Sequence, residues 1–262
     1  MDESARNRSH VQSLSRALKL IETLAGDESE MSLTEIATKL EWPKSTVHGI
    51  LATLRDYRFV DQSPDNGRYH LGIRLFEFGQ KAARNWGIRE IALPFMHKLN
   101  ALCGEMVQLA TEDAGEVFYL EKIDSTHIIR IVSEIGARLP IHCNGLGKVL
   151  LAYRSPSEIK SILTRNGMRR MTGRTITDIS QMESELAQVR KLGYAMDNQE
   201  IMEGLCCVAA PIRDRDGTVK YAISVSGLAE RVLGVYFETI KDSVVRAAAE
   251  ISYEMGYREH SE

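Results

Sequence analysis

Side chains that could bind DNA recur along one face of the segment KSTVHGILATLRD, which begins at Lys44. Lys44, Ser45, His48 and Arg55 are neighbours on one side of a helix, and the apolar residues of the segment fall on the other side. Lysine and arginine can bind phosphates, while serine, threonine and histidine can reach base edges in the major groove. Gly49 lies on the same face, although glycine costs about 1 kcal/mol relative to alanine inside a helix. The pattern predicts a surface that another molecule approaches closely.

Catalytic and metal-binding patterns are weak by comparison. Gly145-Leu-Gly-Lys148 is part of a phosphate-loop pattern, but that pattern needs glycine in place of His142 and serine or threonine in place of Val149. His142 and Cys143 are adjacent on a predicted strand, so their side chains would point to opposite faces and make a poor base–nucleophile pair. The histidines and cysteines show no zinc-site spacing. We therefore expect no enzyme activity, no cofactor and no metal.

Three short helices and a hairpin would position the polar face. Apolar residues at helical spacing predict three helices in the first part of the chain. Ser32 and Glu35 match a capping box before the second helix, and Pro43 suits the first turn of the third. Asn66-Gly67 lies between two short apolar runs and predicts a hairpin. Helices with a tight second junction followed by a hairpin are typical of a winged helix-turn-helix, which we place at residues 1–71.

The remainder of the chain predicts an α+β fold. We expect a helical linker at residues 72–104 and an α+β domain at residues 105–262. Hairpins flanked by helices imply an antiparallel sheet packed on helices. Strands are predicted at residues 107–110, 117–123, 128–133, 205–212 and 219–227. Helices are predicted from about residue 146, at roughly 157–166 and 179–192, and over the last apolar repeat at 233–255.

Charge and composition limit the possible partners. The net charge is −3, so any DNA binding must come from a local patch rather than from bulk attraction. Residues 1–70 hold nine Lys/Arg against eleven Asp/Glu, but the acids cluster in residues 22–41, away from the third helix and the hairpin. The first residues lack the apolar core of a signal peptide, and no apolar run is long enough for a bilayer. We expect a cytoplasmic protein with free thiols.

Several motifs occur in the order found in one known family. They are VQSLSRALKLIETLA, SLTEIATKLEWPKSTVHGILATL, the wing GRYHLG, LPIHCNGLGKVLLA and GYAMDNQEIMEGLCCVAAPIRD. With them the chain resembles the IclR family of bacterial transcription regulators over nearly its whole length. The family usually has an arginine in place of Gly49, and an aromatic residue or histidine in place of Arg213. With glycine at position 49, either the protein recognises a different DNA sequence from its relatives, or it lacks a phosphate contact that is dispensable.

For the front end, the resemblance and the helix face together imply a DNA-binding surface. The residues that we expect to contact DNA are Arg16, Lys44, Ser45, Thr46, His48, Gly49, Arg55, Arg68 and Tyr69. Arg68 is at the tip of the wing, where it suits a phosphate or minor-groove contact.

For the back end, the resemblance implies a GAF-like effector-binding domain. The residues that we expect to line the site are Ile128, Ile131, Leu139, Gly145, Leu146, Asp197, Leu205, Cys207, Ser224 and Ser226. The helix after Gly145 offers free N–H groups to a carboxylate, and Asp197 offers an acceptor to a hydroxyl group. The expected effector is a small keto or hydroxy acid, sugar-derived acids included. In the purely structural alternative the serines face solvent and Asp197 stabilises a turn.

These patterns favour a ligand-responsive regulator of double-stranded operator DNA, a repressor rather than an activator. We expect a homodimer or homotetramer that uses the first helix and the linker helix as its dimer surface. The alternative is a metabolite-binding module without sequence-specific DNA binding, which the absence of operator binding would favour. An α+β enzyme is the third class, and turnover of an acid would reveal it.

Overall fold

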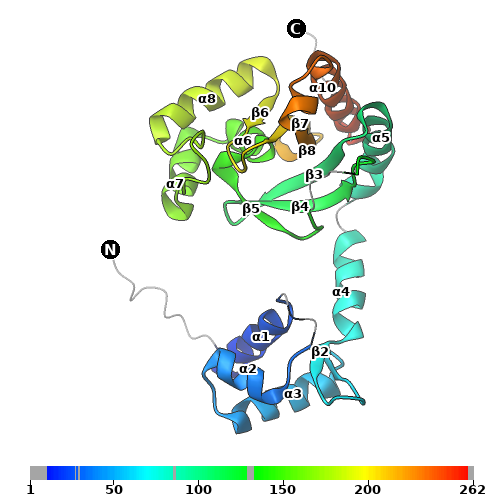
Figure 1. Cartoon of the computed structure of the whole chain (residues 1–262), viewed down its shortest axis with the longest axis vertical. Helices are drawn as coiled ribbons and strands as arrows, with labels where there is room; N and C mark the ends of the chain where they lie inside the picture. The colour runs from blue at the N-terminus through cyan, green and yellow to red at the C-terminus, as the bar shows by residue number, and fades with distance from the viewer. Residues whose placement is uncertain (1–10, 27, 29, 85–86, 129–132, 259–262) are drawn as a thin grey trace. The chain divides into compact units, whose positions relative to one another are not determined.

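A computed structural model describes residues 11–26, 28, 30–84, 87–128 and 133–258 (Figure 1). The chain divides into two compact units, residues 1–86 and 87–262. This boundary falls inside the segment 72–104 that the sequence suggested as a linker. Within the described ranges, no helix combines the length and the apolar character that crossing a bilayer requires.

The first unit contains the predicted helices and hairpin, followed by one more helix. Its elements are α1 (Gln12–Leu24), α2 (Leu33–Leu40), α3 (Lys44–Asp56), β1 (Val60–Gln62), β2 (Tyr69–Leu71) and α4 (Ile73–Arg84). The apolar stripes of α1, α2 and α3 meet in one core that includes Leu20, Ile36 and Leu51. Strands β1 and β2 pair antiparallel, and Gly67 in the turn has φ +70°, a conformation that glycine adopts without strain.

Local signals fix where these helices begin. Ser32 and Glu35 form the predicted capping box, in which each side chain bonds the other residue's backbone N–H. Pro43 is the residue just before α3 rather than a residue of its first turn. Helix α1 begins after Val11, whose side chain forms no capping hydrogen bond.

The second unit is built on one antiparallel sheet in the order β5-β4-β3-β8-β7-β6. Its strands are β3 (Met106–Asp113), β4 (Glu116–Ile123), β5 (Arg138–Pro140), β6 (Ala195–Asn198), β7 (Leu205–Arg213) and β8 (Val219–Leu228). Its helices are α5 (Ile88–Cys103), the 3-10 turn η2 (Ile141–Cys143), α6 (Gly145–Ala152), α7 (Pro156–Asn166), α8 (Ile179–Leu192), α9 (Ala229–Val232) and α10 (Phe237–Glu254).

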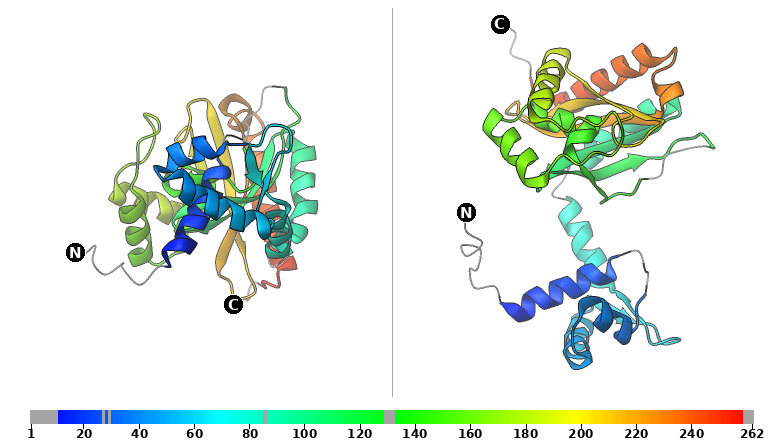
Figure 2. Two further views of the ribbon diagram at one scale, coloured as in Figure 1. Left: turned by 90° about the horizontal axis from the view of Figure 1, so that it is seen from below. Right: turned by 60° about the vertical axis from the view of Figure 1, so that its left-hand side comes forward.

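Helices cover both faces of this sheet. Figure 2 (left) shows α7 and α5 on opposite sides of the strands. Because strand residues alternate between faces, Ile223 and Val225 of β8 pack under α5 and α10, whereas Ala222 joins the core under α6, α7 and α8. Ser224 and Ser226 share the face of Ala222. Polar groups on that face are therefore enclosed by α6 and its neighbours.

The structure adds three local details to these expectations. Helix α5 runs through Pro94, because Ala92, Met96 and Leu99 bury its apolar side on the sheet. Strand β6 was not predicted, since its four residues are too few for a periodic signal. Of the strand expected at residues 128–133, the residues 129–132 lie outside the described part, and Ile128 is in a bend.

Candidate DNA-binding face and ligand cavity

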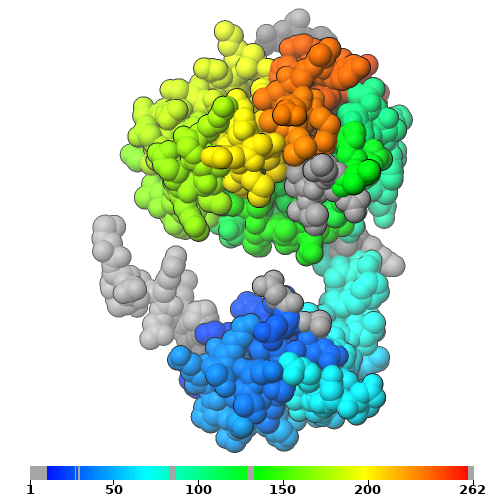
Figure 3. All heavy atoms as spheres, in the orientation of Figure 1, coloured from blue at the N-terminus to red at the C-terminus, as the bar shows by residue number. Residues whose placement is uncertain are grey.

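One face of α3 is open, as the sequence predicted. Val47 and Leu51 are buried in the core of the first unit, while Lys44, Ser45 and His48 are exposed. Figure 3 shows α3 on the surface of this unit. The helix therefore presents a cation, a hydroxyl group and an imidazole to solvent, side by side.

Gly49 is in the middle of this open face. A Cβ atom added there would meet nothing within 4 Å. The carbonyl oxygen of Gly49 accepts a hydrogen bond from Thr53 Oγ1 at 3.1 Å. Packing against the described residues therefore does not require a glycine at this position, and the glycine leaves a stretch of helix without a side chain.

Arg55, also on α3, is connected to the wing. Its Nη1 donates to Gln62 Oε1 at 2.7 Å, and Gln62 Nε2 donates to the carbonyl oxygen of Gly67 at 2.8 Å. This chain of hydrogen bonds joins the end of α3 to the turn between β1 and β2. Arg55 thereby helps to hold the wing beside the helix.

The structure gives Arg68 an internal partner that the sequence did not indicate. Arg68 Nη2 lies 2.6 Å from Glu35 Oε2 and also donates to the carbonyl oxygen of Glu30 at 3.1 Å. The Ser32 backbone N–H and the Arg68 guanidinium hold the pKa of Glu35 below its usual value. A phosphate would have to compete with Glu35 for this guanidinium.

Three other predicted DNA contacts differ in exposure. Thr46 is half-buried, and Arg16 lies with its guanidinium 5.8 Å from the ring centre of Trp42. Tyr69 is only 6% exposed, because its ring packs in the core and its backbone pairs with Met31. The Tyr69 ring is therefore not presented to a ligand, and the prediction that it contacts DNA loses its basis.

The second unit contains a cavity of about 590 Å³ on the α6 side of the sheet. A volume of this order suits a small molecule. Six of the predicted effector-binding residues line it: Leu139, Leu146, Asp197, Leu205, Cys207 and Ser226.

Three predicted residues that the structure describes do not line the cavity. Ser224 is fully buried behind it, and Ile128 is fully exposed. Gly145 lies against Cys207, where an added Cβ would come within 2.8 Å of the Cys207 sulfur. Ile131 is outside the described residues.

Asp197 is the most unusual group in the cavity wall. Its side chain is fully buried, and its Oδ1 accepts a hydrogen bond from the Glu200 backbone N–H at 2.6 Å. Its Oδ2 has no hydrogen-bond partner among the described residues. Burial raises the pKa of this carboxyl to about 7, and the charge of Glu200 acts in the same direction. An unpaired buried carboxylate oxygen at a cavity is suited to a ligand that donates a hydrogen bond.

Sequence reasoning missed an amide at the centre of the cavity. Gln108 Oε1 accepts hydrogen bonds from Ser226 Oγ at 2.7 Å and Ser224 Oγ at 3.4 Å, and Gln108 Nε2 donates to Ser133 Oγ at 3.2 Å. Tyr119 also lines the cavity, and burial raises the pKa of its hydroxyl, so the hydroxyl stays neutral. Strand alternation could have identified Gln108, because it faces the same side as Ser224.

A buried ion network lies behind Asp197. Lys148 of α6 is 1% exposed, and its Nζ donates to the carboxylate of Glu200, to Glu185 Oε1 at 2.9 Å and to the Met196 carbonyl oxygen at 3.0 Å. Burial opposes the charge on Lys148, but Glu200 and Glu185 outweigh it and raise the pKa of Lys148. The lysine therefore stays charged and joins α6 to β6.

The charge of the cavity wall limits how a carboxylate ligand could bind. The described lining residues include no lysine or arginine, and they include Glu134 as well as Asp197. A carboxylate would therefore use neutral donors, such as the Tyr119 hydroxyl, the Gln108 amide and the N–H groups at the start of α6.

The site has no nucleophile or metal cluster in the part of the chain that the structure describes. Burial raises the pKa of Cys207 to about 12, so its thiol is neutral near pH 7. No group of three histidine, cysteine, aspartate or glutamate side chains could hold a metal ion among the described residues.

Comparison with known protein families identifies both units. Residues 13–64 match the IclR helix-turn-helix domain, and residues 80–253 match the bacterial transcriptional regulator IclR C-terminal domain. The second match alone covers more than half of the 262 residues.

Similar proteins cover nearly the whole chain. The transcriptional regulator KdgR of Escherichia coli is 36% identical, with 95% of both chains covered. The transcriptional repressor AllR of the same species is 32% identical over 95% of this chain and 92% of its own. The IclR homologue of Microbacterium hydrocarbonoxydans, solved with 4-hydroxybenzoate, aligns with a TM-score of 0.84 at 26% identity, over 93% of this chain and 98% of that one.

Proposed function

This chain belongs to the IclR family of DNA-binding transcription regulators with C-terminal effector-binding domains, and we propose that it is a repressor controlled by a small organic acid. Its named relatives are regulators and not enzymes. The repressor role is supported by the relative AllR, which is named as one. Because the proposed target is chromosomal DNA, we propose that the protein acts in the cytoplasm.

The open face of α3 carries the DNA-binding part of the proposal. Lys44 would bind a backbone phosphate, and Ser45 and His48 would reach base edges in the major groove. Arg55 would hold the wing through Gln62 at the edge of this surface. The internal pairing of Arg68 with Glu35 makes Arg68 a weaker candidate for a phosphate contact than the sequence suggested.

The unpaired Oδ2 of Asp197 carries the effector part. A hydroxyl group, or the hydrated form of a keto group, would donate to this oxygen. The carboxylate of the same ligand would accept from the start of α6 and from the neutral donors around Gln108. The aromatic hydroxy acid bound by the Microbacterium homologue supports this class of ligand. The antiparallel sheet with helices on its faces supports a GAF-like description of this unit.

We further propose a homodimer, which can pair as a homotetramer, on a pseudo-palindromic operator. The supporting observation is an unusual number of exposed apolar side chains on α1 and α4 of the first unit. They are Leu14, Leu18, Ile73, Phe76 and Phe78. Such a surface is expected to be covered by a second copy of the chain.

Titration of labelled promoter DNA at two salt concentrations tests the central claim. Specific binding should weaken steeply with salt, because each phosphate contact releases counterions. Adding a panel of keto and hydroxy acids should then shift the affinity for operator but not for random DNA. Binding without sequence preference would overturn the regulator assignment and favour a metabolite-binding module.

A further inference from the structure

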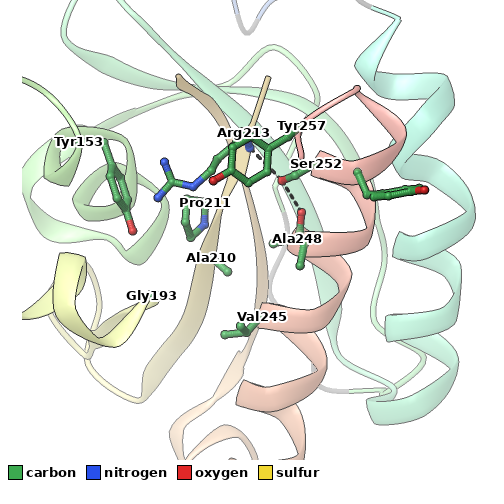
Figure 4. Close-up of a pocket in the computed structure, with 11 residues that line it drawn as sticks. Tyr153, Gly193, Ala210, Pro211, Arg213, Val245, Ala248, Ser252 and Tyr257 are labelled. Atoms are coloured by element: carbon green, nitrogen blue, oxygen red, sulfur yellow. Dashed lines mark hydrogen bonds between the residues drawn. The ribbon is translucent and has the colours of Figure 1, made fainter. Parts of the chain in front are cut away.

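A second cavity in the second unit lies at the β7 edge of the sheet, between α10 and the segments that follow α6 and α8. It measures about 410 Å³, and its lining includes Ala210, Val245, Tyr153, Arg213 and Tyr257 (Figure 4). Ala210 and Val245 belong to the apolar core under α10 or pack against it. The cavity therefore has an apolar floor and a rim of aromatic rings around one cation.

Arg213 is held in place at this rim. Its backbone N–H donates to Ser252 Oγ at 2.9 Å, and its Nη1 donates to the Gly217 carbonyl oxygen at 3.0 Å. Its guanidinium carbon lies 4.6 Å from the ring centre of Tyr153 and 5.8 Å from that of Tyr257. Figure 4 shows the guanidinium group directed toward Tyr153. Stacking on rings leaves the edge of a guanidinium group free to donate hydrogen bonds.

Among the described residues, no acid balances the charge of Arg213. The residues that line the cavity include no aspartate or glutamate, and Arg213 forms no ion pair with any described residue. Burial raises the pKa of the Tyr153 hydroxyl, although Arg213 and Arg190 oppose this shift. Tyr153 therefore remains a neutral donor beside the cation. A half-buried cation with a neighbouring donor and no acid favours an anion.

We propose that this cavity binds a small carboxylate with a flat apolar body, held by Arg213 at its charged end. The carboxylate would accept from the guanidinium group and the Tyr153 hydroxyl, and the flat body would lie on Ala210 and Val245 beside the Tyr257 ring. This site is separate from the Asp197 cavity. It does not depend on the proposed function, because the two cavities share no lining residue.

Crystals of the full chain soaked in 4-bromobenzoate would locate the site directly. The anomalous signal of bromine should appear beside Arg213, whether or not a second signal appears beside Asp197. Signal beside Asp197 alone, or none, would overturn the proposal. Because the two positions are distinct in one map, failure here leaves the effector assignment unaffected.

Binding in solution provides the matched control. With 4-fluorobenzoate followed by fluorine NMR, Arg213→Met should weaken one binding event about tenfold or more, which is the effect of losing a charged hydrogen bond. Arg215→Met makes the same charge change two residues away, at a side chain that is 83% exposed, and should leave binding unchanged. Equal effects of the two variants, with both folded by circular dichroism, would contradict the proposal. So would equal binding of uncharged 4-fluorobenzamide.

Discussion

At the scale of single residues, Asp197 combines a cost to stability with the proposed role in ligand binding. Its raised pKa means that between about pH 4 and pH 7 the folded chain holds a proton that the unfolded chain releases. Stability from this residue is therefore greatest at low pH and is lost as pH rises toward 7. A carboxylate that served only the fold would be expected to show the opposite trend.

Asp197→Asn should make the protein more stable and unresponsive. At pH 8 we expect the variant to gain on the order of a few kcal/mol in unfolding free energy, because it removes a buried charge. At pH 5, closer to the pKa of the unfolded carboxyl, the gain should be clearly smaller. Urea melts at both pH values and operator titration with effector measure the two effects. A variant that is less stable at pH 8, or still responsive, would remove Asp197 from this role.

Gly49 leads to a second prediction at this scale. Since an added Cβ meets nothing within 4 Å, Gly49→Ala should stabilise the first unit by about 1 kcal/mol through helix propensity alone. If a DNA base approaches the helix backbone at Gly49, Gly49→Ala should weaken operator binding. Gly49→Arg should add a phosphate contact and make the salt dependence of binding steeper by about one ion. Affinities of the parent and both variants at several salt concentrations distinguish these outcomes.

At the scale of elements, Lys148 joins α6 to β6 next to Asp197 and its cavity. Lys148→Met would leave Glu200 buried without its cation and should destabilise the second unit by about 3–5 kcal/mol. Adding Glu200→Gln should recover part of this loss, because the uncompensated charge is gone. Thermal melts of both variants measure the recovery. If the double variant is as unstable as the single one, packing rather than charge explains the lysine.

The elements could be predicted from the sequence where a local pattern specified them. The capping box of Ser32 and Glu35, the Asn66-Gly67 turn and the periodic apolar stripes each occupy a few neighbouring residues. The cavity depended on contacts between distant residues, and these were found only in part. Asp197, Cys207 and Ser226 followed from the family resemblance, whereas Gln108 and Tyr119 meet them only through the pairing of β3 with β4 and β8.

Arg68 and Tyr69 show the limit of the same reasoning at the wing. Both were expected to face DNA because they follow the turn. In the fold, Arg68 pairs with Glu35, which is 33 positions away, and Tyr69 fills the core beside Met31. No local sequence pattern in the hairpin predicts that Arg68 contacts Glu35 or that Tyr69 contacts Met31.

At the scale of the whole molecule, self-association should be necessary for function. Leu18→Glu on the exposed side of α1 should shift the protein toward monomers and weaken operator binding at least tenfold, since two linked half-sites bind far better than one. Sedimentation velocity and operator titration test both parts. Lys19→Glu is a control of larger charge change on the same helix. Full operator affinity in a monomeric Leu18→Glu variant would exclude this dimer surface.

Helix α6 and strand β7 each border both cavities of the second unit. Leu146, near the first residue of α6, lines one cavity, and Tyr153, just after its last, lines the other, about 10 Å away at the usual rise per residue. On β7 the corresponding pair is Cys207 and Arg213. If occupancy of one cavity shifts these shared segments, each metabolite must change the affinity for the other by an equal factor. The activity of a single promoter could then depend on the concentrations of two metabolites at once.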